Sequence, residues 1–410
     1  MTTPRVLNLT RLGWGLAIPV LILASIGLAS IHATDRSRPA VTPTDVAARR
    51  VPAETNWLTV VAREIGPLTL RQSIYLVTGV GLLLLTLVPS YRRIGQYSYV
   101  IYGFVLALLL LLFLDRYVDL PLIPFRRDTR RWIELGPLRL QPSEFMKVAL
   151  ILALAWYLRY RKSYRTWRGL IPPFLLTLVP MVLILKQPDL GTMLMLLPVL
   201  FSMLFVAGAR MRHLATIVLL GCATLPVFYA FGMKPYQRRR IQVLFRQNVA
   251  DEKWHMGPGY QLRQGLIALG TGGFTGEGLG EGAVVQYGLL PEEHNDFIFA
   301  VIGNQWGLIG CLVVIACYVV IIVCGLEVAT VTNDPFGRLL AVGVVVMIVA
   351  QALLNICMNL GLAPITGMTL PFVSAGGSSM WANFLALGLL VNVAQRRPML
   401  IAHPPFEYDD

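Results

Sequence analysis

The stretch Leu290–Val323, LPEEHNDFIFAVIGNQWGLIGCLVVIACYVVIIV, places four ionisable side chains directly before a long apolar run. The four side chains belong to Glu292, Glu293, His294 and Asp296. The apolar run is long enough to cross a bilayer as an α-helix. An acidic side chain at the start of such a helix is stabilised by the positive end of the helix dipole. It can cap the helix or carry out proton chemistry at the membrane surface, and the stretch alone leaves both roles open.

Apolar runs of this kind recur along the whole chain, which has 410 residues, of which 56% are hydrophobic and 14% charged. The mean hydropathy is +0.64. A series of soluble domains, which the length alone suggests, does not fit this pattern. The sequence predicts an all-α polytopic membrane protein in which residues 1–410 form a single integral-membrane domain. The first run, 12–33, lacks a small-x-small cleavage site, so we interpret it as a retained anchor.

The apolar runs predict ten transmembrane spans, at residues 12–33, 73–90, 96–114, 142–159, 169–186, 189–208, 214–232, 297–325, 337–361 and 368–394. An even number of spans places both termini on the same side of the membrane. The short loops on that side are rich in Lys and Arg, which identifies it as the cytoplasmic side. Residues 396–410 are therefore expected to form a cytoplasmic tail.

Three loops on the opposite, outer side are long and basic, at residues 34–72, 115–141 and 233–296. Long loops are translocated whatever their charge, so the predicted orientation holds. A basic outer surface has two explanations. It can attract anionic lipid headgroups, or it can hold an anionic substrate through arginine side chains that match phosphate oxygens. The charge pattern leaves both explanations open.

The large loop 233–296 is where we expect the chemistry. It opens with Tyr236-Gln237-Arg238-Arg239-Arg240-Ile241, in which three consecutive cations follow an aromatic residue. It also contains the glycine-rich run GTGGFTGEGLGEG, from Gly270 to Gly282. No strand, following helix or Gly-Lys-Ser/Thr accompanies these glycines, which argues against a nucleotide-binding loop. We interpret this part of the loop as a re-entrant or interfacial segment, since its apolar stretch, Leu262–Leu269, is far too short to span a membrane.

Polar side chains also fall within the predicted spans. Glu144 and Lys147 are three residues apart near the start of span 142–159, so they share one helix face and can pair. Such a pair inside a membrane is either structural or part of a functional site. Glycines and serines at the start of span 368–394 predict a break in the helix. Asn355 and Asn359, four residues apart, add an amide face near that break.

Several short motifs occur together in a specific order, which resembles the SEDS family (shape, elongation, division and sporulation proteins). The order is nearer to the RodA branch of that family than to the FtsW branch. The resemblance covers residues 72 to 395. It is carried by Arg131-Trp132-Ile133, Gln141-Pro142-Ser143-Glu144 with Lys147, Lys186-Gln187-Pro188-Asp189-Leu190-Gly191-Thr192, Tyr236-Gln237 with Arg240-Ile241, His294-Asn295-Asp296-Phe297-Ile298-Phe299, Pro364-Ile365-Thr366-Gly367, and Leu370-Pro371-Phe372 with Ser374 and Gly376-Gly377-Ser378-Ser379.

The resemblance implies a ten-span peptidoglycan glycosyltransferase that polymerises lipid II at the outer face of the bacterial cytoplasmic membrane. It implies a role in cell-wall elongation and cell shape, a class B penicillin-binding transpeptidase as partner, and no nucleic-acid partner. Asp296 matches the essential acidic residue of the family's large outer loop. Arg131, Glu144, Lys147 and Arg240 match polar positions around its central cavity.

Glycan polymerisation from a lipid pyrophosphate needs a base for the acceptor hydroxyl and cations for the departing pyrophosphate. We expect Asp296 to act as the base, since the family's inversion at the sugar carbon requires no covalent intermediate. Arg131, Arg239 and Arg240 are the expected pyrophosphate contacts. The full set of predicted substrate-binding residues is Arg131, Glu144, Lys147, Arg239, Arg240, His294, Ser374 and Ser378.

A metal site is not predicted from the sequence. The five histidines show no metal-ligand spacing. The five cysteines lie in apolar segments without a C-x-x-C pair, and we interpret them as small core residues. A divalent cation, Mg²⁺ or Mn²⁺, is able to share the phosphate charge of the substrate, although no ligand cluster demands one.

Two features depart from the family pattern. After the aspartate the family commonly continues with a Glu-Glu pair, whereas this chain reads Gly303-Asn304-Gln305-Trp306-Gly307. The first outer loop, 34–72, is longer and more basic than expected, which is compatible with partner docking. Two other function classes remain open: a lipid II flippase, and a non-catalytic scaffold for the transpeptidase. Substitution of Asp296 by Asn discriminates, since a flippase or a scaffold tolerates it and a glycosyltransferase does not.

Overall fold

The structure is a computed structural model, and it describes residues 13–37, 66–118, 131–136, 138–161, 163–247, 257–282, 286–291 and 293–396. The helices are α1 (Trp14–Ser37), α4 (Pro67–Leu87), α5 (Tyr91–Gln96), α6 (Ser98–Val118), α7 (Pro142–Leu158), α8 (Trp167–Lys186), α9 (Leu190–Ala207), α10 (Met211–Val227), α11 (Pro235–Phe245), α13 (Tyr260–Thr271), α15 (Ile298–Val331), α16 (Pro335–Asn359) and α17 (Gly377–Gln395). Helix α10 continues into a π-helical turn, Phe228–Gly232. A hairpin of β1 (Ile133–Leu135) and β2 (Leu138–Leu140) precedes α7.

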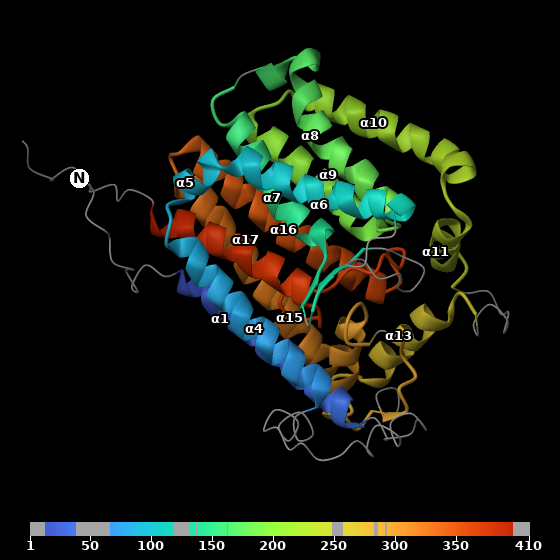
Figure 1. Cartoon of the computed structure of the whole chain (residues 1–410). Coiled ribbons are helices and arrows are strands. Elements are labelled where there is room, and N and C mark those ends of the chain that lie inside the picture. The colour runs from blue at the N-terminus through green and yellow to red at the C-terminus, as the bar shows by residue number, and fades with distance from the viewer. Residues whose placement is uncertain are drawn as a thin grey trace, which may run out of the picture.

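The predicted fold class is confirmed: the structure is a bundle of long helices (Figure 1). Within the described residues, nine helices are long and apolar enough to cross a membrane. The remaining predicted span, 142–159, corresponds to α7, which has 17 residues and is buried among the other helices. Each of the ten predicted spans therefore overlaps one helix of the bundle.

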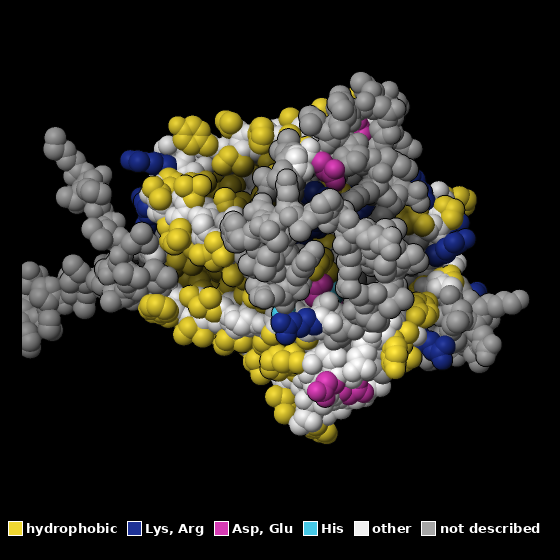
Figure 2. Space-filling model, turned by 60° about the horizontal axis from the view of Figure 1, so that its bottom comes forward, with side chains coloured by type: hydrophobic (Ala, Val, Ile, Leu, Met, Phe, Trp, Pro, Cys, Tyr) yellow, Lys and Arg dark blue, Asp and Glu magenta, His cyan; other side chains and the backbone are white. Residues whose placement is uncertain are grey.

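The centre of the bundle is formed by α7, α16 and α17, whose side chains are mostly buried. Helix α7 contacts α6, α8, α9, α16 and α17. Small side chains such as Ala149, Ala153 and Ala155 are fully buried there, and they allow neighbouring helices to approach closely. Large apolar side chains on the outer helices are exposed, and on the face in Figure 2 they cover much of the flank of the bundle. This pattern is typical of a lipid-facing surface.

The helix ends differ from the prediction in three places. Helix α1 extends to Ser37 and α4 begins at Pro67, so the first connection is shorter than the predicted loop 34–72. Its two ends are joined, because a carboxylate oxygen of Asp35 accepts hydrogen bonds from the backbone N–H groups of Leu68 (3.0 Å) and Thr69 (3.2 Å). Helix α15 continues beyond the predicted end at 325, to Val331.

The last span begins at Gly377, nine residues after the predicted start at 368. The segment 368–376 is not helical, because Pro371 interrupts the backbone hydrogen bonding and Phe372 adopts a positive φ of 65°. A break in predicted span 368–394 is thus confirmed, but it lies before the Gly376-Gly377 pair, and Ser378 and Ser379 are already helical.

The β-hairpin was not predicted from the sequence, which indicated only a long basic loop at residues 115–141. Its strands pair Ile133 with Leu140 and Leu135 with Leu138. Gly136 at the turn has a φ of 64°, a conformation that glycine adopts without strain. The hairpin places its last strand directly before α7 and thereby leads the chain from the outer loop into the centre of the bundle.

Candidate active site

Asp296 lies in a turn at the start of α15. The helix begins at Ile298 with Phe297 at its N-cap, so Asp296 is not the capping residue, and that reading is wrong. The cap is replaced by an amide from another helix: the side-chain oxygen of Asn359 accepts a hydrogen bond from the backbone N–H of Ala300 (3.2 Å).

The backbone carbonyl of Asp296 is fixed by the amide face predicted on span 337–361. The side-chain N–H groups of Asn355 and Asn359 both donate to it, over 2.9 and 3.0 Å. Asn355 also donates to the carbonyl of Met368 (2.6 Å). Both asparagines are fully buried. Because buried hydrogen bonds of this kind are expensive to break, the turn that carries Asp296 is rigidly positioned.

The two preceding carbonyls are held by the non-helical segment 368–376. Ser374 donates its hydroxyl to the carbonyl of Asn295 (2.6 Å), and the backbone N–H of Ala375 donates to the carbonyl of His294 (2.8 Å). The carbonyl of Ser374 in turn accepts from the side chain of Gln72 on α4 (3.0 Å). Three consecutive carbonyls before α15 thus have specific donors from α16 and from the segment before α17.

The side chain of Asp296 faces Arg240 across Gly367. A Cβ atom added to Gly367 would lie 3.5 Å from Oδ2 of Asp296 and 4.0 Å from Nη1 of Arg240. Gly367 also has a φ of 79°, which disfavours other residues at this position. Arg240 is half-buried on α11, and the start of that helix is closed by Gln237, whose side chain accepts from the backbone N–H of Lys234 (2.9 Å).

A second cation lies close to Arg240. Burial lowers the pKa of Arg240, and the positive charge of Arg131 lowers it further, whereas Asp296 acts in the opposite direction. Burial also raises the pKa of Tyr236, against the effect of the same two arginines. The hydroxyl of Tyr236 is buried and has no hydrogen-bond partner among the described residues. Asp189 acts on Arg240 and Tyr236 as well, so two guanidinium groups and two carboxylates lie within electrostatic reach of one another here.

Arg131 is positioned by the turn between α8 and α9. Its Nε donates to the carbonyl of Gln187 (2.6 Å), and its Nη2 donates to the carbonyl of Pro188. The next residue, Asp189, caps α9 by accepting from the backbone N–H of Thr192 (3.2 Å). The Gln-Pro-Asp turn recognised in the sequence thus holds the side chain of Arg131, one of the predicted pyrophosphate contacts.

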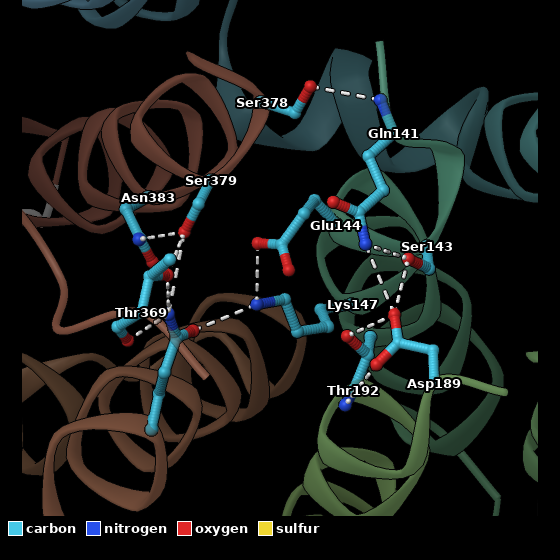
Figure 3. A network of polar contacts seen from close by, with 11 residues as sticks. Gln141, Ser143, Glu144, Lys147, Asp189, Thr192, Thr369, Ser378, Ser379 and Asn383 are labelled. Carbon is cyan, nitrogen blue, oxygen red and sulfur yellow. Dashed lines mark hydrogen bonds and ion pairs between the residues drawn. The ribbon is translucent and has the colours of Figure 1, made fainter. Parts of the chain in front are cut away.

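Glu144 and Lys147 form the predicted pair (Figure 3). The Nζ of Lys147 lies 2.9 Å from Oε2 of Glu144 and donates to Oε1 of Gln351 on α16 (2.8 Å). The side-chain nitrogen of Gln351 donates to the carbonyl and hydroxyl of Thr369, over 3.0 and 3.1 Å. The pair thus belongs to a buried network that joins α7 and α16 to the segment leading from Gly367 into α17.

The remaining predicted site residues are placed differently. Ser378 is buried, donates to the carbonyl of Arg139 (3.0 Å) and accepts from the backbone N–H of Gln141 (2.9 Å), so it attaches the hairpin to α17. His294 is buried, with Nε2 3.5 Å from a carboxylate oxygen of Glu293. Arg239 is exposed on α11. Substrate contact by any of the predicted residues stays a prediction.

Four functional features were missed by the sequence reasoning: Tyr236, Asp189, Gln351 and the polar network around Thr369 and Ser379. Tyr236 and Asp189 lie inside motifs that were recognised, so their positions beside Arg240 and Arg131 were a usable signal. Gln351 had none, because its contact with Lys147 joins residues 204 positions apart. In the part of the chain that the structure describes, no group of three or more His, Cys, Asp or Glu side chains is arranged to hold a metal ion. The divalent cation stays a prediction.

The glycine-rich run packs against a kink in α15. The kink is at Gly307, with φ 64° and ψ −159°. The backbone N–H groups of Leu308 and Ile309 donate to the carbonyls of Gly273 (2.9 Å) and Phe274 (3.3 Å) instead of back along the helix. The run therefore supplies hydrogen-bond partners to a broken helix, and its placement as a re-entrant or interfacial segment stays a prediction.

The departure from the family's Glu-Glu pair lies at the same kink. The carbonyls of Asn304 and Gln305 accept from the backbone N–H groups of Glu277 (2.9 Å) and Gly278 (3.3 Å). The side-chain nitrogen of Asn304 also donates to a carboxylate oxygen of Glu277 (3.1 Å). A neutral amide at position 304 thus meets an acidic side chain, where a glutamate would place two like charges together.

Comparison with known proteins identifies the family. The family model described as cell cycle protein, covering FtsW, RodA and SpoVE, matches residues 59–398. A probable peptidoglycan glycosyltransferase FtsW of Geobacter metallireducens is 38% identical over 331 residues, 80% of this chain and 84% of that protein. Peptidoglycan glycosyltransferase MrdB of Escherichia coli is 33% identical over 307 residues, 73% of this chain and 78% of that protein.

Solved structures agree with these relatives. A chain from a peptidoglycan synthase complex that coordinates polymerization and crosslinking is 29% identical, with a TM-score of 0.72, over 93% of this chain and 97% of its own. The rod shape determining protein RodA of Thermus thermophilus is 28% identical, with a TM-score of 0.63, over 94% and 97%. The predicted family is confirmed by sequence and by fold: this chain belongs to the FtsW, RodA and SpoVE family of cell cycle proteins, the SEDS family.

Proposed function

We propose that this protein polymerises lipid II into glycan strands at the outer face of the cytoplasmic membrane, with Asp296 as the catalytic base. The peptidoglycan glycosyltransferase class and the role in cell-wall synthesis rest on the named relatives that match most of the chain. The observation that carries the assignment of Asp296 is its position opposite Arg240 across Gly367, on a turn fixed by buried amides.

The proposed reaction is a single displacement. Asp296 takes the proton of the acceptor sugar hydroxyl while that oxygen bonds to the anomeric carbon of the donor. The bond from this carbon to the pyrophosphate oxygen breaks, and the pyrophosphate leaves with the electron pair. Arg240 and Arg131 stabilise the resulting negative charge, because guanidinium groups match phosphate oxygens well. A positioned base of this kind contributes about 10²–10⁴-fold in rate.

Glu144 and Lys147 have a positioning role in this proposal. Their network reaches Thr369, two residues after Gly367, and it passes through Gln351 on the helix that also carries Asn355 and Asn359. The pair thus supports the segment at which the base and the cation meet. Full polymerase activity together with unchanged thermal stability in Glu144→Gln would contradict this role.

The proposed partner is a class B penicillin-binding transpeptidase, as suggested by the similarity to a solved peptidoglycan synthase complex. We place both termini in the cytoplasm, with loop 233–296 carrying the active site outside. A role in elongation and cell shape is part of the proposal: the similarity to RodA of Thermus thermophilus supports it, and the higher identity to FtsW of Geobacter metallireducens supports division instead.

The test is glycan polymerisation from purified lipid II by wild type and Asp296→Asn in detergent, each with and without a candidate transpeptidase. Glu327→Gln is a matched control, since it removes an exposed carboxylate from the far end of α15. We expect polymer from wild type and the control and none from an equally folded Asp296→Asn. Equal polymer from all three removes Asp296 as the base. No polymer from any of them, even with the partner, favours a flippase or a scaffold.

A further inference from the structure

A second polar cavity lies at the end of the bundle opposite the Asp296 site. It has a volume of about 260 Å³ and is lined by Arg92, Gln96, Trp156, Arg159, Tyr160, Asp334 and Phe336. These residues come from α5 and its flanks, the end of α7 and the start of α16. Helix α16 runs from Asp334 beside this cavity to Asn359 beside Asp296, a length of about 37 Å at 1.5 Å per residue. The two sites therefore lie near opposite surfaces of a membrane.

The walls of the cavity are aromatic and rigid. Trp156 packs edge to face on Phe336, with ring centroids 5.3 Å apart, and Tyr91 stacks on the other side of Phe336 at 6.1 Å. The guanidinium of Arg159 lies over the Trp156 ring, 3.1 Å from its centroid, and 4.9 Å from the centroid of Tyr160. Stacking holds the guanidinium plane while leaving its N–H edges available as donors.

The charges in the cavity do not balance. Arg92 lies 3.6 Å from Asp334, and the same carboxylate oxygen accepts from the backbone N–H of Gly337 as the cap of α16. The guanidinium group of Arg159 has no ion pair or hydrogen bond with any residue that the structure describes. Asp334 is the single acid among the lining residues, so two guanidinium groups and one carboxylate leave a net charge of +1.

We propose that this cavity binds a singly charged phosphate diester through Arg92 and Arg159. The ligand chemistry fits in three respects: one negative charge matches the net charge of the walls, planar guanidinium groups match phosphate oxygens, and the side chain of Gln96 supplies a further donor. The cavity is smaller than the roughly 300–1,000 Å³ of pockets for drug-sized ligands, which suits a headgroup. Two sources offer this chemistry: an anionic phospholipid of the adjacent leaflet, or a soluble phosphate diester.

The phospholipid source is favoured by the position of the cavity. Trp156 and Tyr160 stand at the end of a membrane helix, where aromatic side chains meet the headgroup layer. Exposed apolar side chains lie nearby, at Tyr97 after α5 and at Val100 and Phe104 on the first turns of α6. A phospholipid whose phosphate entered the cavity would therefore have an apolar surface nearby for its acyl chains.

The test compares retained lipid by native mass spectrometry of full-length protein in nanodiscs of phosphatidylcholine with and without phosphatidylglycerol. The variants are Arg92→Gln, Arg159→Gln and the double variant. Arg161→Gln is the matched control, because Arg161 also lies over an aromatic ring, that of Tyr157, at 4.4 Å but outside the cavity. We expect each cavity variant to lose about tenfold in phosphatidylglycerol retention, since a hydrogen bond to a charged group is worth about that factor.

Calorimetry with sn-glycero-3-phosphoglycerol, a soluble phosphate diester with one negative charge, forms the second arm. If wild type binds this ester, the cavity variants do not, and the protein shows no preference for phosphatidylglycerol, the phosphate site is supported and its ligand is the soluble source. Equal loss in Arg161→Gln, or no preference for phosphatidylglycerol together with no ester binding, overturns the proposal. Thermal unfolding and glycan polymerisation confirm that each variant is folded, and Arg159→Lys, which keeps the charge, is expected to retain part of the binding.

Discussion

The two halves of the candidate active site are held in different ways. Asp296 is half-buried, and the backbone carbonyls of its turn are bound by side chains of α16 and by the segment before α17. Arg240 is also half-buried, but it lies on a short helix of loop 233–296. The difference suggests that the base has one fixed position, whereas the cations adapt to the leaving group. A base must meet one hydroxyl in one geometry, while pyrophosphate offers several oxygens.

The substitution Asp296→Asn distinguishes the two halves of the candidate active site most clearly. We expect the rate of polymerisation to fall by about 10²–10⁴-fold, the contribution of a positioned base. The midpoint of thermal unfolding should change little, because the buried amides of Asn355 and Asn359 bind the backbone carbonyl of residue 296, which the substitution keeps. The measurement is turnover of lipid II beside a thermal shift. A large loss of stability would show that the carboxylate itself holds the turn.

Breaking the pair of Glu144 and Lys147 should have the largest effect on stability. Lys147 is fully buried, and Lys147→Met leaves Glu144 without its cation. We expect a loss of about 3–5 kcal/mol, as for one partner removed from a buried ion pair. Thermal unfolding in detergent measures it. The double variant Glu144→Gln/Lys147→Met should recover most of the loss, and no recovery would mean that Lys147 acts through Gln351 alone.

The fixed position of the base is tested by Asn359→Leu. This change removes a donor from the carbonyl of Asp296 and the acceptor of the Ala300 N–H, so we expect a loss of about 1–3 kcal/mol in stability and lower activity. Asn392→Leu is the control, since its amide binds the carbonyls of Thr86 and Pro89 far from the site. Both variants should lose stability, but only Asn359→Leu should lose activity at a temperature where both remain folded.

The smallest effect is expected at the kink of α15. Asn304→Glu restores an acid of the family pattern but places it beside Glu277, and we expect a loss of about 1 kcal/mol because Glu277 is exposed. Adding Glu277→Gln should remove that loss. The measurement is thermal unfolding at low and high salt. A loss of stability that persists in the double variant Asn304→Glu/Glu277→Gln would show that its cause is packing and not charge.

Local patterns predicted the parts of the molecule that depend on near neighbours. The spacing of Glu144 and Lys147 predicted their pair, the spacing of Asn355 and Asn359 predicted an amide face, and the apolar runs predicted the helices. The function of that amide face was not predictable, because its contacts with Asp296 join residues about sixty positions apart. The hairpin was missed for a related reason, since its strands have three residues each and too little sequence to show an alternating pattern.

The predicted site residues show the same difference between what near neighbours in the sequence reveal and what distant contacts decide. The acidic cluster and the family motifs pointed to Asp296, and the structure brings Arg131 and Arg240 towards it. Ser374 and Ser378 were chosen as polar residues in a broken helix, and their hydroxyls bind the backbone instead. A hydroxyl in a sequence does not reveal whether its partner is a ligand or a distant carbonyl.

The junction between the glycine-rich run and α15 has a consequence for how the sequence can vary. Gly273 and Phe274 accept from one side of the break, while Glu277 and Gly278 donate to the other, so the spacing within the run matches the spacing across the kink. An insertion of one residue between positions 274 and 277 would put one of these pairs out of register. In homologues, we expect the length of this run to be constant wherever the kink glycine is kept, and the two stretches to change together during evolution.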